Sequence, residues 1–346
     1  MPRIALKIDV DTDQGTATGA LQLARALERR GIPATFLFSV GPDHTGRALR
    51  RVFRRGFLGK VRRTSVLKHY GMRTLLYGTL LPGPHIGRRR ADVMRSIAGS
   101  GFEVGVHAYD HVKWQDGVAS ADEHWTRRQL VLANDEFGEI FGRGPVVHGA
   151  AGWQMNAYVP GLQEQLGFRY ASDTRGTHAF MPMVNGVVYA IPQLPTTLPT
   201  LDELLGREDV PQSALAAHLQ ALVEQSGADH VFTLHAELEG CAYLELFLEL
   251  IDRWRASGFL LGDLAGHHAA LRESALPVHE LALGQVEGRS GWLAVQGPAQ
   301  HAVSARTTLQ YSSVTGGVLR ETELATSDWD NSDSPLDHDG DRPRPP

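Results

Sequence analysis

Short apolar runs alternate along the chain with longer segments of helical periodicity, and this alternation permits few folds. Eight runs have the length and apolar character of buried strands: residues 4–9, 34–40, 102–107, 145–150, 168–172, 187–192, 230–235 and 259–264. Five segments between them have helical spacing: residues 17–30, 124–141, 157–166, 213–226 and 244–257. Glycine, which favours the end of a helix, follows four of these segments, at positions 31, 167, 227 and 258. Strands and helices in alternation predict a parallel sheet, most economically closed into a β/α barrel.

The composition is that of a globular protein, and it narrows the choice of partners. Apolar residues make up 42% of the 346 residues and charged residues 21%. A formal net charge of −5 gives no reason to expect nucleic acid as a partner. The one cysteine, Cys241, excludes an internal disulfide framework and a cysteine-based metal cluster, and we expect it to be a small buried thiol.

The N-terminus enters the first predicted strand almost at once. Only Met1, Pro2 and Arg3 precede it, which leaves no room for a signal peptide. No run of 18 apolar residues occurs, so we expect no transmembrane helix. These features predict a cytoplasmic protein.

Polar residues gather at one end of the predicted strands. The groups at or just after a C-terminal strand end are Asp9, Asp11, His107, the turn 149–153, Asp173 and His235. In a β/α barrel this face carries the active site, because the loops that follow the strands converge there. Six such groups at one end support both the barrel and an active site in it.

Two histidines and a pair of aspartates have the spacing of a metal site. His107 and His111 lie four residues apart at a strand end, and they share one face if the chain turns helical there. Asp9 and Asp11 are two residues apart on another strand, so they point to the same side. Two imidazoles and one carboxylate form the facial pattern of a catalytic metal, and the second carboxylate remains to accept a proton. The alternatives are a turn-capping aspartate and loop histidines with ordinary hydrogen bonds.

A third histidine, His235, ends another predicted strand. It can serve as a general acid toward a leaving group, as a further metal ligand, or as a hydrogen-bonded core residue. Glu237 and Glu239 follow it. Three roles are open for these glutamates: they orient the histidine, they bind substrate hydroxyls, or they form an acidic cluster at the N-terminus of a helix.

Residues 44–91 interrupt the pattern with a strongly basic insertion. We count thirteen Lys or Arg in it and no Asp or Glu. Its first part places Leu49, Val52, Phe53, Phe57 and Val61 roughly on one helical face, with Arg50, Arg51, Arg54 and Arg55 on the other. A basic amphipathic segment with aromatic residues is typical of contact with an anionic membrane surface. A solvated insertion and nucleic-acid binding are the alternatives.

The periodicity ends near residue 300. Residues 327–346 are rich in Asp, Pro and Ser and have almost no apolar side chains. Such a segment cannot bury enough surface to fold. We therefore expect a barrel over residues 1–300 and a poorly structured acidic tail over residues 301–346.

These motifs resemble those of the NodB-like polysaccharide deacetylase family. The family's first motif is similar to residues 7–12, its His-x-x-x-His motif to residues 107–111, and its Leu-x-His-type motif to residues 233–235. The resemblance implies a distorted (β/α) barrel and one divalent metal ion, with zinc expected and manganese, iron or cobalt as alternatives. It also implies roles for the matching residues: Asp9 as catalytic base, His235 as general acid, and Asp11, His107 and His111 as metal ligands.

One branch of the family matches over more of the chain. Seven segments resemble the deformylases of 4-deoxy-4-formamido-L-arabinose-phosphoundecaprenol: residues 38–43, 105–108, 150–153, 172–176, 193–199, 235–243 and 291–293. This implies removal of a formyl group from a polyprenyl-phosphate-linked sugar, for lipid A modification and resistance to polymyxin and other cationic peptides. Such an enzyme would be cytoplasmic and peripheral on the inner membrane.

Two other functions remain open at this point. One is a deacetylase of another N-acylated sugar or glycan. The other is a noncatalytic barrel that binds a lipid or a sugar. The complete set of catalytic and metal-ligating residue types argues against the second, because binding alone needs no such set.

The sequence departs from the general family pattern at one point. The usual Arg-x-Pro-Tyr segment is replaced by Ala-Gly-Trp at residues 151–153, so the arginine that orients the catalytic base is missing. Arg175, two residues after Asp173, is the candidate to replace it, and the alternative is an ordinary Asp–Arg surface pair. Three roles are open for Trp153: it closes the site around a small formyl group, it stacks on the sugar, or it packs in the core.

Overall fold

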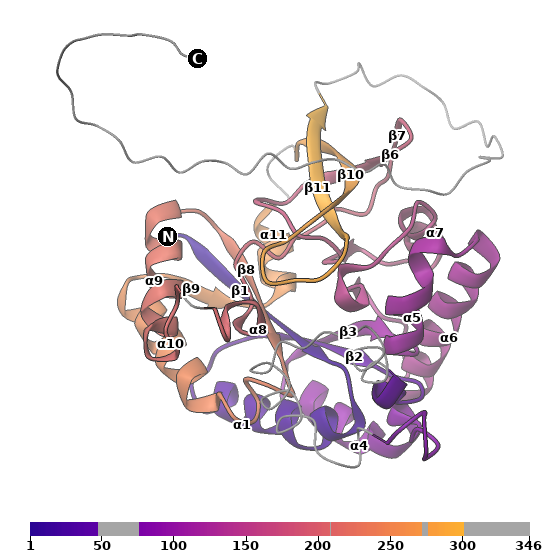
Figure 1. The fold of residues 1–346 in the computed structure, drawn as a ribbon, viewed down its shortest axis with the longest axis horizontal. Coiled ribbons are helices and arrows are strands. Elements are labelled where there is room, and N and C mark those ends of the chain that lie inside the picture. The colour runs from indigo at the N-terminus through magenta and orange to yellow at the C-terminus, as the bar shows by residue number, and fades with distance from the viewer. Residues whose placement is uncertain (48–75, 208, 272–275, 301–346) are drawn as a thin grey trace, which may run out of the picture.

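The computed structural model describes residues 1–47, 76–207, 209–271 and 276–300. Seven strands form the main sheet, and every pairing in it is parallel. Their order is β5 (Tyr170–Ala171), β4 (Val147–His148), β3 (Glu103–Ala108), β2 (Thr35–Ser39), β1 (Arg3–Val10) and β8 (His230–His235), with β9 (Leu260–Gly262) beside the start of β1. The sheet curls, with helices around it, into the distorted (β/α) barrel that the sequence predicts (Figure 1).

The barrel is open, which differs from the closed barrel expected as the simplest arrangement. Within the described ranges no pairing joins the two end strands β5 and β8. Strand β9 shares one edge of β1 with β2, because residues 3–5 of β1 pair with β9 and residues 7–10 pair with β2. Seven of the eight predicted strands belong to this sheet.

All five predicted helical segments are confirmed. The helices are α1 (Leu21–Glu28), which follows a π-helical turn (Gly15–Ala20), α4 (Ile86–Gly99), α5 (His111–Gly117), α6 (Glu123–Phe141), α7 (Val159–Gln165), α8 (Leu201–Leu204), α9 (Leu215–Ser226), α10 (Leu244–Ala256) and α11 (Leu264–Leu271). Short 3-10 turns lie at Val118–Ser120, Ala151–Trp153 and Gln212–Ala214. The four glycines predicted to follow helices all have positive φ, from 58° at Gly227 to 85° at Gly258. Glycine adopts this conformation without steric cost, so it ends a helix readily.

Strand β1 lies inside the sheet and alternates between two environments. The core between sheet and helices contains Ile4, Leu6, Ile8 and Val10. Ala5 belongs instead to a separate buried cluster on the other side of the strand. Because successive side chains of a strand point to opposite faces, Lys7 and Asp9 share the side of Ala5, inside the curl. The functional side chains of β1 are thus separated from the main core.

A second, four-stranded sheet lies beside the barrel, and the sequence predicts little of it. Its order is β11 (Leu293–Gln300), β10 (Val278–Gly284), β6 (Met181–Val184) and β7 (Val187–Val188). The prediction that residues 187–192 form a strand of the parallel sheet is wrong. Only the short strand β7 forms there, and it pairs antiparallel with β6. Asn185 and Gly186 between them have φ of 52° and 81°, the backbone of a tight hairpin turn.

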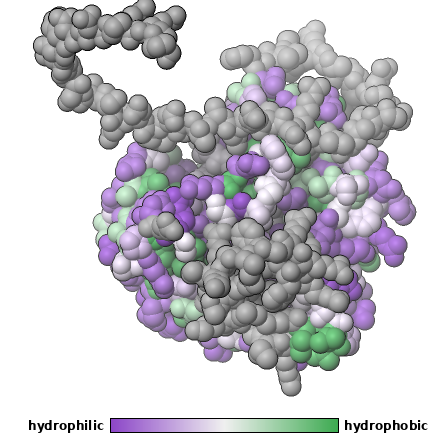
Figure 2. All heavy atoms as spheres, in the orientation of Figure 1, coloured by the Kyte–Doolittle hydropathy of each residue, from purple (hydrophilic) through white to green (hydrophobic). Residues whose placement is uncertain are grey.

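Much of the basic insertion, with Arg50, Arg51, Arg54 and Arg55, lies outside the described residues, as does the tail 301–346. The last residues of the insertion belong to α4, which begins at Ile86. Leu80 and Leu81, just before it, are 81% and 42% exposed. On the face shown in Figure 2 the described surface is mixed, with a compact hydrophobic area at the lower right. Among the helices described, none is long and apolar enough to span a membrane.

Candidate active site

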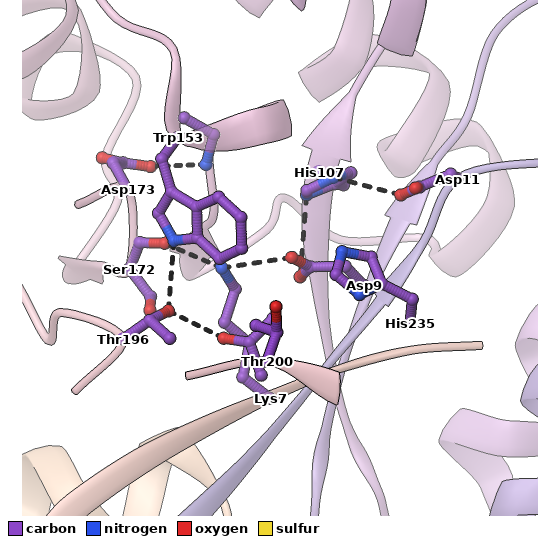
Figure 3. A network of polar contacts seen from close by, with 12 residues as sticks. Lys7, Asp9, Asp11, His107, Trp153, Ser172, Asp173, Thr196, Thr200 and His235 are labelled. Atoms are coloured by element: carbon purple, nitrogen blue, oxygen red, sulfur yellow. Dashed lines mark hydrogen bonds and ion pairs between the residues drawn. The ribbon is translucent and has the colours of Figure 1, made fainter. Parts of the chain in front are cut away.

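The pairing of β1 with β8 brings together the residues predicted as base and acid. Asp9 lies opposite His235 in the parallel register, and the backbone N of Ala236 donates to Asp9 O at 2.9 Å. Both residues lie at the C-terminal ends of their strands, where the sequence predicts the site. Figure 3 shows these side chains with His107 and Asp11 close by.

Asp11, His107 and His111 form the candidate metal centre. One ligand atom of each lies within 4.8 Å of those of the other two. Nε2 of His107 is 3.2 Å from Asp11 Oδ1, and Nε2 of His111 is 3.5 Å from Asp11 Oδ2. Of the two aspartates, Asp11 is therefore the one that clusters with both histidines.

This donor set fits a divalent cation. Asp11 Oδ1 is buried and accepts no hydrogen bond from any described residue, although His107 is close to it. A buried polar atom without a partner calls for a specific cause, such as an ion. Burial would raise the pKa of the Asp11 carboxyl, but the neighbouring charges of His111 and His107 outweigh burial and hold the pKa well below its usual range. The carboxylate is thus ionised, as a metal ligand must be.

The turn after β3 carries the second histidine into the cluster. Helix α5 begins at His111, and the side chain of the preceding Asp110 accepts a hydrogen bond from Lys113 N at 3.1 Å. An aspartate in this position satisfies a free N–H group at the start of a helix. The chain becomes helical only at His111, while His107 still lies in β3, and the two rings are 5.3 Å apart, centroid to centroid.

Asp9 has one oxygen held and one available. Its Oδ2 lies 3.3 Å from the Lys7 ammonium. Its Oδ1 is buried and 3.7 Å from His107 Nδ1, and it has no hydrogen-bond partner in the described part of the chain. A carboxylate oxygen in this state, beside the candidate metal centre, can accept a proton from a nearby molecule.

His235 is held by three neighbours. Its Nδ1 lies 3.5 Å from Asp202 Oδ1, at the start of α8. Its backbone N donates to Glu239 Oε2 at 2.8 Å. Its ring meets the Trp153 ring at 80°, with 6.4 Å between the centroids. The carboxylate and the indole together restrict the orientation of the imidazole.

Glu237 and Glu239 are buried and hold backbone groups. Glu237 Oε1 accepts hydrogen bonds from the backbone N of Asp11 at 3.1 Å and of Thr12 at 2.9 Å, so it fixes the turn that carries a metal ligand. Both glutamates lie in a turn, and α10 begins only at Leu244, so the alternative of a helix N-terminal cluster is wrong. Cys241 in the same turn is only half-buried, although the sequence predicts a buried thiol.

The Glu239 carboxyl should make stability depend on pH. Burial raises its pKa to about 7, from an ordinary value of 4.5. The protonated Glu239 carboxyl makes its full contribution to the free energy of unfolding below 4.5, the pKa of the unfolded chain. This contribution is lost as the pH rises from there through 7. We expect neutral Glu239→Gln to melt higher than the wild type at pH 8, by about 2–4 °C for each kcal/mol regained, and no higher at pH 4. Thermal melts at both pH values measure this, and equal melting temperatures at pH 8 would contradict it.

Asp173 and Arg175 support the turn that carries Trp153. Asp173 is buried and accepts hydrogen bonds from His148 Nδ1 at 2.7 Å and from Ala150 N at 2.8 Å. Arg175 is buried and ion-paired with Glu203. The two residues do not form the surface pair considered as an alternative. Of the lysine and arginine side chains in the described residues, the one ion-paired with Asp9 is Lys7, not Arg175, which corrects the expectation from sequence.

Trp153 is 2% exposed, and three cations lie around its ring beside the catalytic candidates. Its Nε1 donates to Thr196 Oγ1 at 3.1 Å. The Lys7, Arg175 and Arg289 cations lie 5.3, 5.1 and 4.7 Å from its ring. Its φ of 53° is unusual for a bulky residue, and such strained positions are frequent at functional sites. Trp153 is therefore both tightly packed and adjacent to His235.

Four residues around the site are not among those that the sequence predicts: Lys7, Asp202, Glu203 and Arg289. Lys7 carries a usable signal, because it is a charged residue two positions before Asp9 among the apolar residues of β1. The other three come from α8 and from the loop between β10 and β11, where no periodicity marks them. Arg289 lies 2.9 Å from Asp202 Oδ2 and 2.8 Å from Glu203 Oε1.

A curled parallel sheet with an Asp-His-His cluster at the C-terminal ends of its strands is the arrangement expected of a metal-dependent hydrolase. The family model described as "Polysaccharide deacetylase" matches residues 7–171. The chain belongs to the polysaccharide deacetylase family, as its similarity to the relatives below also shows. The predicted family and fold class are thus confirmed.

Two relatives are similar over nearly their whole length. A protein of Shewanella sediminis (strain HAW-EB3), named "Probable 4-deoxy-4-formamido-L-arabinose-phosphoundecaprenol deformylase ArnD", is 35% identical over 300 residues, which cover 85% of this chain and 94% of that protein. A protein of the same name from Wigglesworthia glossinidia brevipalpis is 30% identical over 283 residues, covering 82% and 98%. The crystal structure of a probable polysaccharide deacetylase from Pseudomonas aeruginosa PAO1 shares the fold, with 15% identity, coverage of 79% and 92%, and a TM-score of 0.55.

Proposed function

We propose that the protein removes the formyl group from 4-deoxy-4-formamido-L-arabinose-phosphoundecaprenol and leaves the 4-amino sugar on its polyprenyl carrier. The observation that carries the proposal is the similarity to relatives named for this activity, which spans 94% and 98% of their lengths. The product would serve lipid A modification and resistance to polymyxin and other cationic peptides. The presence of a candidate metal centre, a candidate base and a candidate acid in one site favours an enzyme over a noncatalytic binding barrel.

Hydrolysis of a formamide requires an activated water, a stabilised oxyanion and protonation of the departing amine. A divalent cation held by Asp11, His107 and His111 would polarise the carbonyl group and lower the pKa of water. We propose zinc as that ion, with manganese, iron or cobalt as alternatives, since two imidazoles and a carboxylate suit all four.

We assign the two proton transfers to Asp9 and His235. Asp9 takes the proton, through Oδ1, from the water that attacks the formyl carbon. His235 gives a proton to the sugar nitrogen as the C–N bond breaks, so that formate and the free amine leave. Asp9 and His235 are paired neighbours on the adjacent strands β1 and β8, and this placement supports the division of roles.

Selectivity for the acyl group tests the proposal against the main alternative, a deacetylase of another N-acylated sugar. The packed indole of Trp153 beside His235 favours a small acyl group. The assay compares formate and acetate release from two lipid-linked sugars that differ only in a methyl group. We expect faster deformylation by at least about tenfold, the usual effect of one such group in a packed pocket. Faster deacetylation would favour the alternative.

We further propose that the protein is cytoplasmic and peripheral on the inner membrane, where the lipid-linked substrate lies. The basic insertion 44–91 supports this, because its charge complements anionic headgroups. The exposed Leu80 and Leu81 at its described end are apolar side chains suited to the same surface.

Replacing Arg50, Arg51, Arg54 and Arg55 by Ser should release the protein from anionic vesicles. Each basic residue near an anionic surface contributes on the order of 1 kcal/mol, so binding should weaken by about 10²–10³-fold. Sedimentation with phosphatidylglycerol vesicles measures this. A matched control replaces the exposed Arg25, Arg29, Arg253 and Arg255 by Ser, which removes the same charge elsewhere. Unchanged sedimentation of the first variant, or equal loss in the control, would remove the insertion as the contact.

A further inference from the structure

A buried lysine lies beside the proposed catalytic base. Lys7 has 0% exposure, and its Nζ lies 3.3 Å from Asp9 Oδ2. The same ammonium donates a hydrogen bond to Ser172 O at 3.1 Å. A buried charge is unfavourable unless it is paired and hydrogen-bonded, and here one carboxylate and one carbonyl meet both needs.

The turn around residues 149–153 is shaped to receive this lysine. A Cβ atom on Gly149 would lie 2.3 Å from Leu37 Cδ1 and 3.1 Å from Lys7 Cε, so glycine lets the turn pack closely against both side chains. Trp153, from the end of the same turn, places its ring 5.3 Å from Lys7 Nζ, where the π face attracts a cation. Figure 3 shows Lys7 between the Trp153 ring and the Asp9 carboxylate.

Other cations near the site have different partners. Arg175 is ion-paired with Glu203, and its side chain also donates to the backbone O of Thr196 and Leu198. Arg289 is ion-paired with Asp202 and Glu203. The turn 151–153 itself contains no arginine. Among the lysine and arginine side chains of the described ranges, Lys7 is thus the one that contacts Asp9.

We propose that Lys7 is the positioning residue of the catalytic base. The terminal torsion of an aspartate is soft, so an unanchored carboxylate samples many orientations. The contact of Lys7 with Oδ2 fixes that torsion and leaves Oδ1 on the side of His107, available to the reacting water. The cation therefore comes from the same strand as the base, two residues before it, and the Trp153 ring covers it. The inference rests on the proposed role of Asp9 and extends it to a residue outside the Asp-His-His cluster.

The test compares two substitutions of Lys7 in the metal-loaded, full-length protein. Lys7→Met keeps the length and volume of the chain but removes the charge, whereas Lys7→Arg keeps the charge. We expect Lys7→Met to lower kcat by about 100-fold, the effect of a misplaced catalytic group, with KM and metal content unchanged. Lys7→Arg should restore kcat to within about tenfold of the wild type. Lys113→Met, the same change at an exposed position on α5, is the matched control.

The outcomes separate positioning from packing. A Lys7→Met variant that keeps wild-type kcat, or a folded Lys7→Arg variant that loses as much as Lys7→Met, overturns the proposal. If Lys7→Met does not fold, Lys7→Gln takes its place with the same expected loss. The comparison uses any N-acylated sugar that the wild type hydrolyses. An inactive wild type on the formamido lipid therefore contradicts the proposed substrate, whereas equal kcat across the Lys7 variants contradicts the positioning role.

Discussion

Asp9→Asn should leave the metal in place and lower kcat by about 10²–10⁴-fold, the usual contribution of a general base. Asparagine has the shape of aspartate, but its amide cannot take a proton from water at neutral pH. Asp9 is not part of the Asp-His-His cluster, so the substitution removes no ligand from it. Turnover at saturating substrate and metal content by elemental analysis are measured on the same sample.

Two results would contradict this account of Asp9. Full turnover would show that another group accepts the proton. Loss of the metal together with turnover would show that Asp9, and not only Asp11, is a ligand. A thermal melt accompanies both measurements, because the substitution leaves the buried Lys7 ammonium without its carboxylate.

His107→Ala should lose the metal and the activity together. His107 lies at the end of β3 with Nε2 3.2 Å from Asp11 Oδ1, and it supplies one of the three donor groups of the cluster. Two remaining ligands are fewer than the three that catalytic sites of this kind use. We expect metal content to fall from about one ion per chain to a small fraction, with turnover lost in proportion.

The matched control for that substitution is His124→Ala, the same change at an exposed position on α6. It should keep both the metal and the activity. A His107→Ala protein that retains stoichiometric metal would exclude the proposed centre. A protein that loses the metal but keeps full turnover would exclude metal dependence of the reaction.

The main sheet can be predicted from sequence because its strands are covered on both faces. Strands β2 and β8 therefore read as continuous apolar runs, for example at residues 34–40 and 230–235. The second sheet is smaller and partly exposed, and the burial of β10 alternates, which gives a weaker signal. Asn185-Gly186 is a hairpin signal that the sequence does offer, and it marks the turn from β6 to β7.

The candidate catalytic and metal-ligating residues can also be predicted from the sequence, whereas the residues that contact and hold them cannot. Asp9 and Asp11, like His107 and His111, are close in sequence around the C-terminal end of a strand, so each pair stays at the same end of the sheet. Asp202 meets His235, and Glu203 meets Arg175, only through packing between distant segments. The expectation that Arg175 orients the base fails for this reason: proximity in sequence to Asp173 does not reveal that a buried glutamate from α8 binds the guanidinium.

The most direct measurement is mass spectrometry of formamido-arabinosyl undecaprenyl phosphate after incubation with the purified protein in detergent, with and without a chelator. Loss of one formyl group, prevented by the chelator and restored by added zinc, is the predicted result. An unchanged lipid in the presence of folded, metal-loaded protein would contradict the proposed substrate. Loss of the formyl group at the same rate in the metal-free protein would contradict the proposed use of Asp11, His107 and His111.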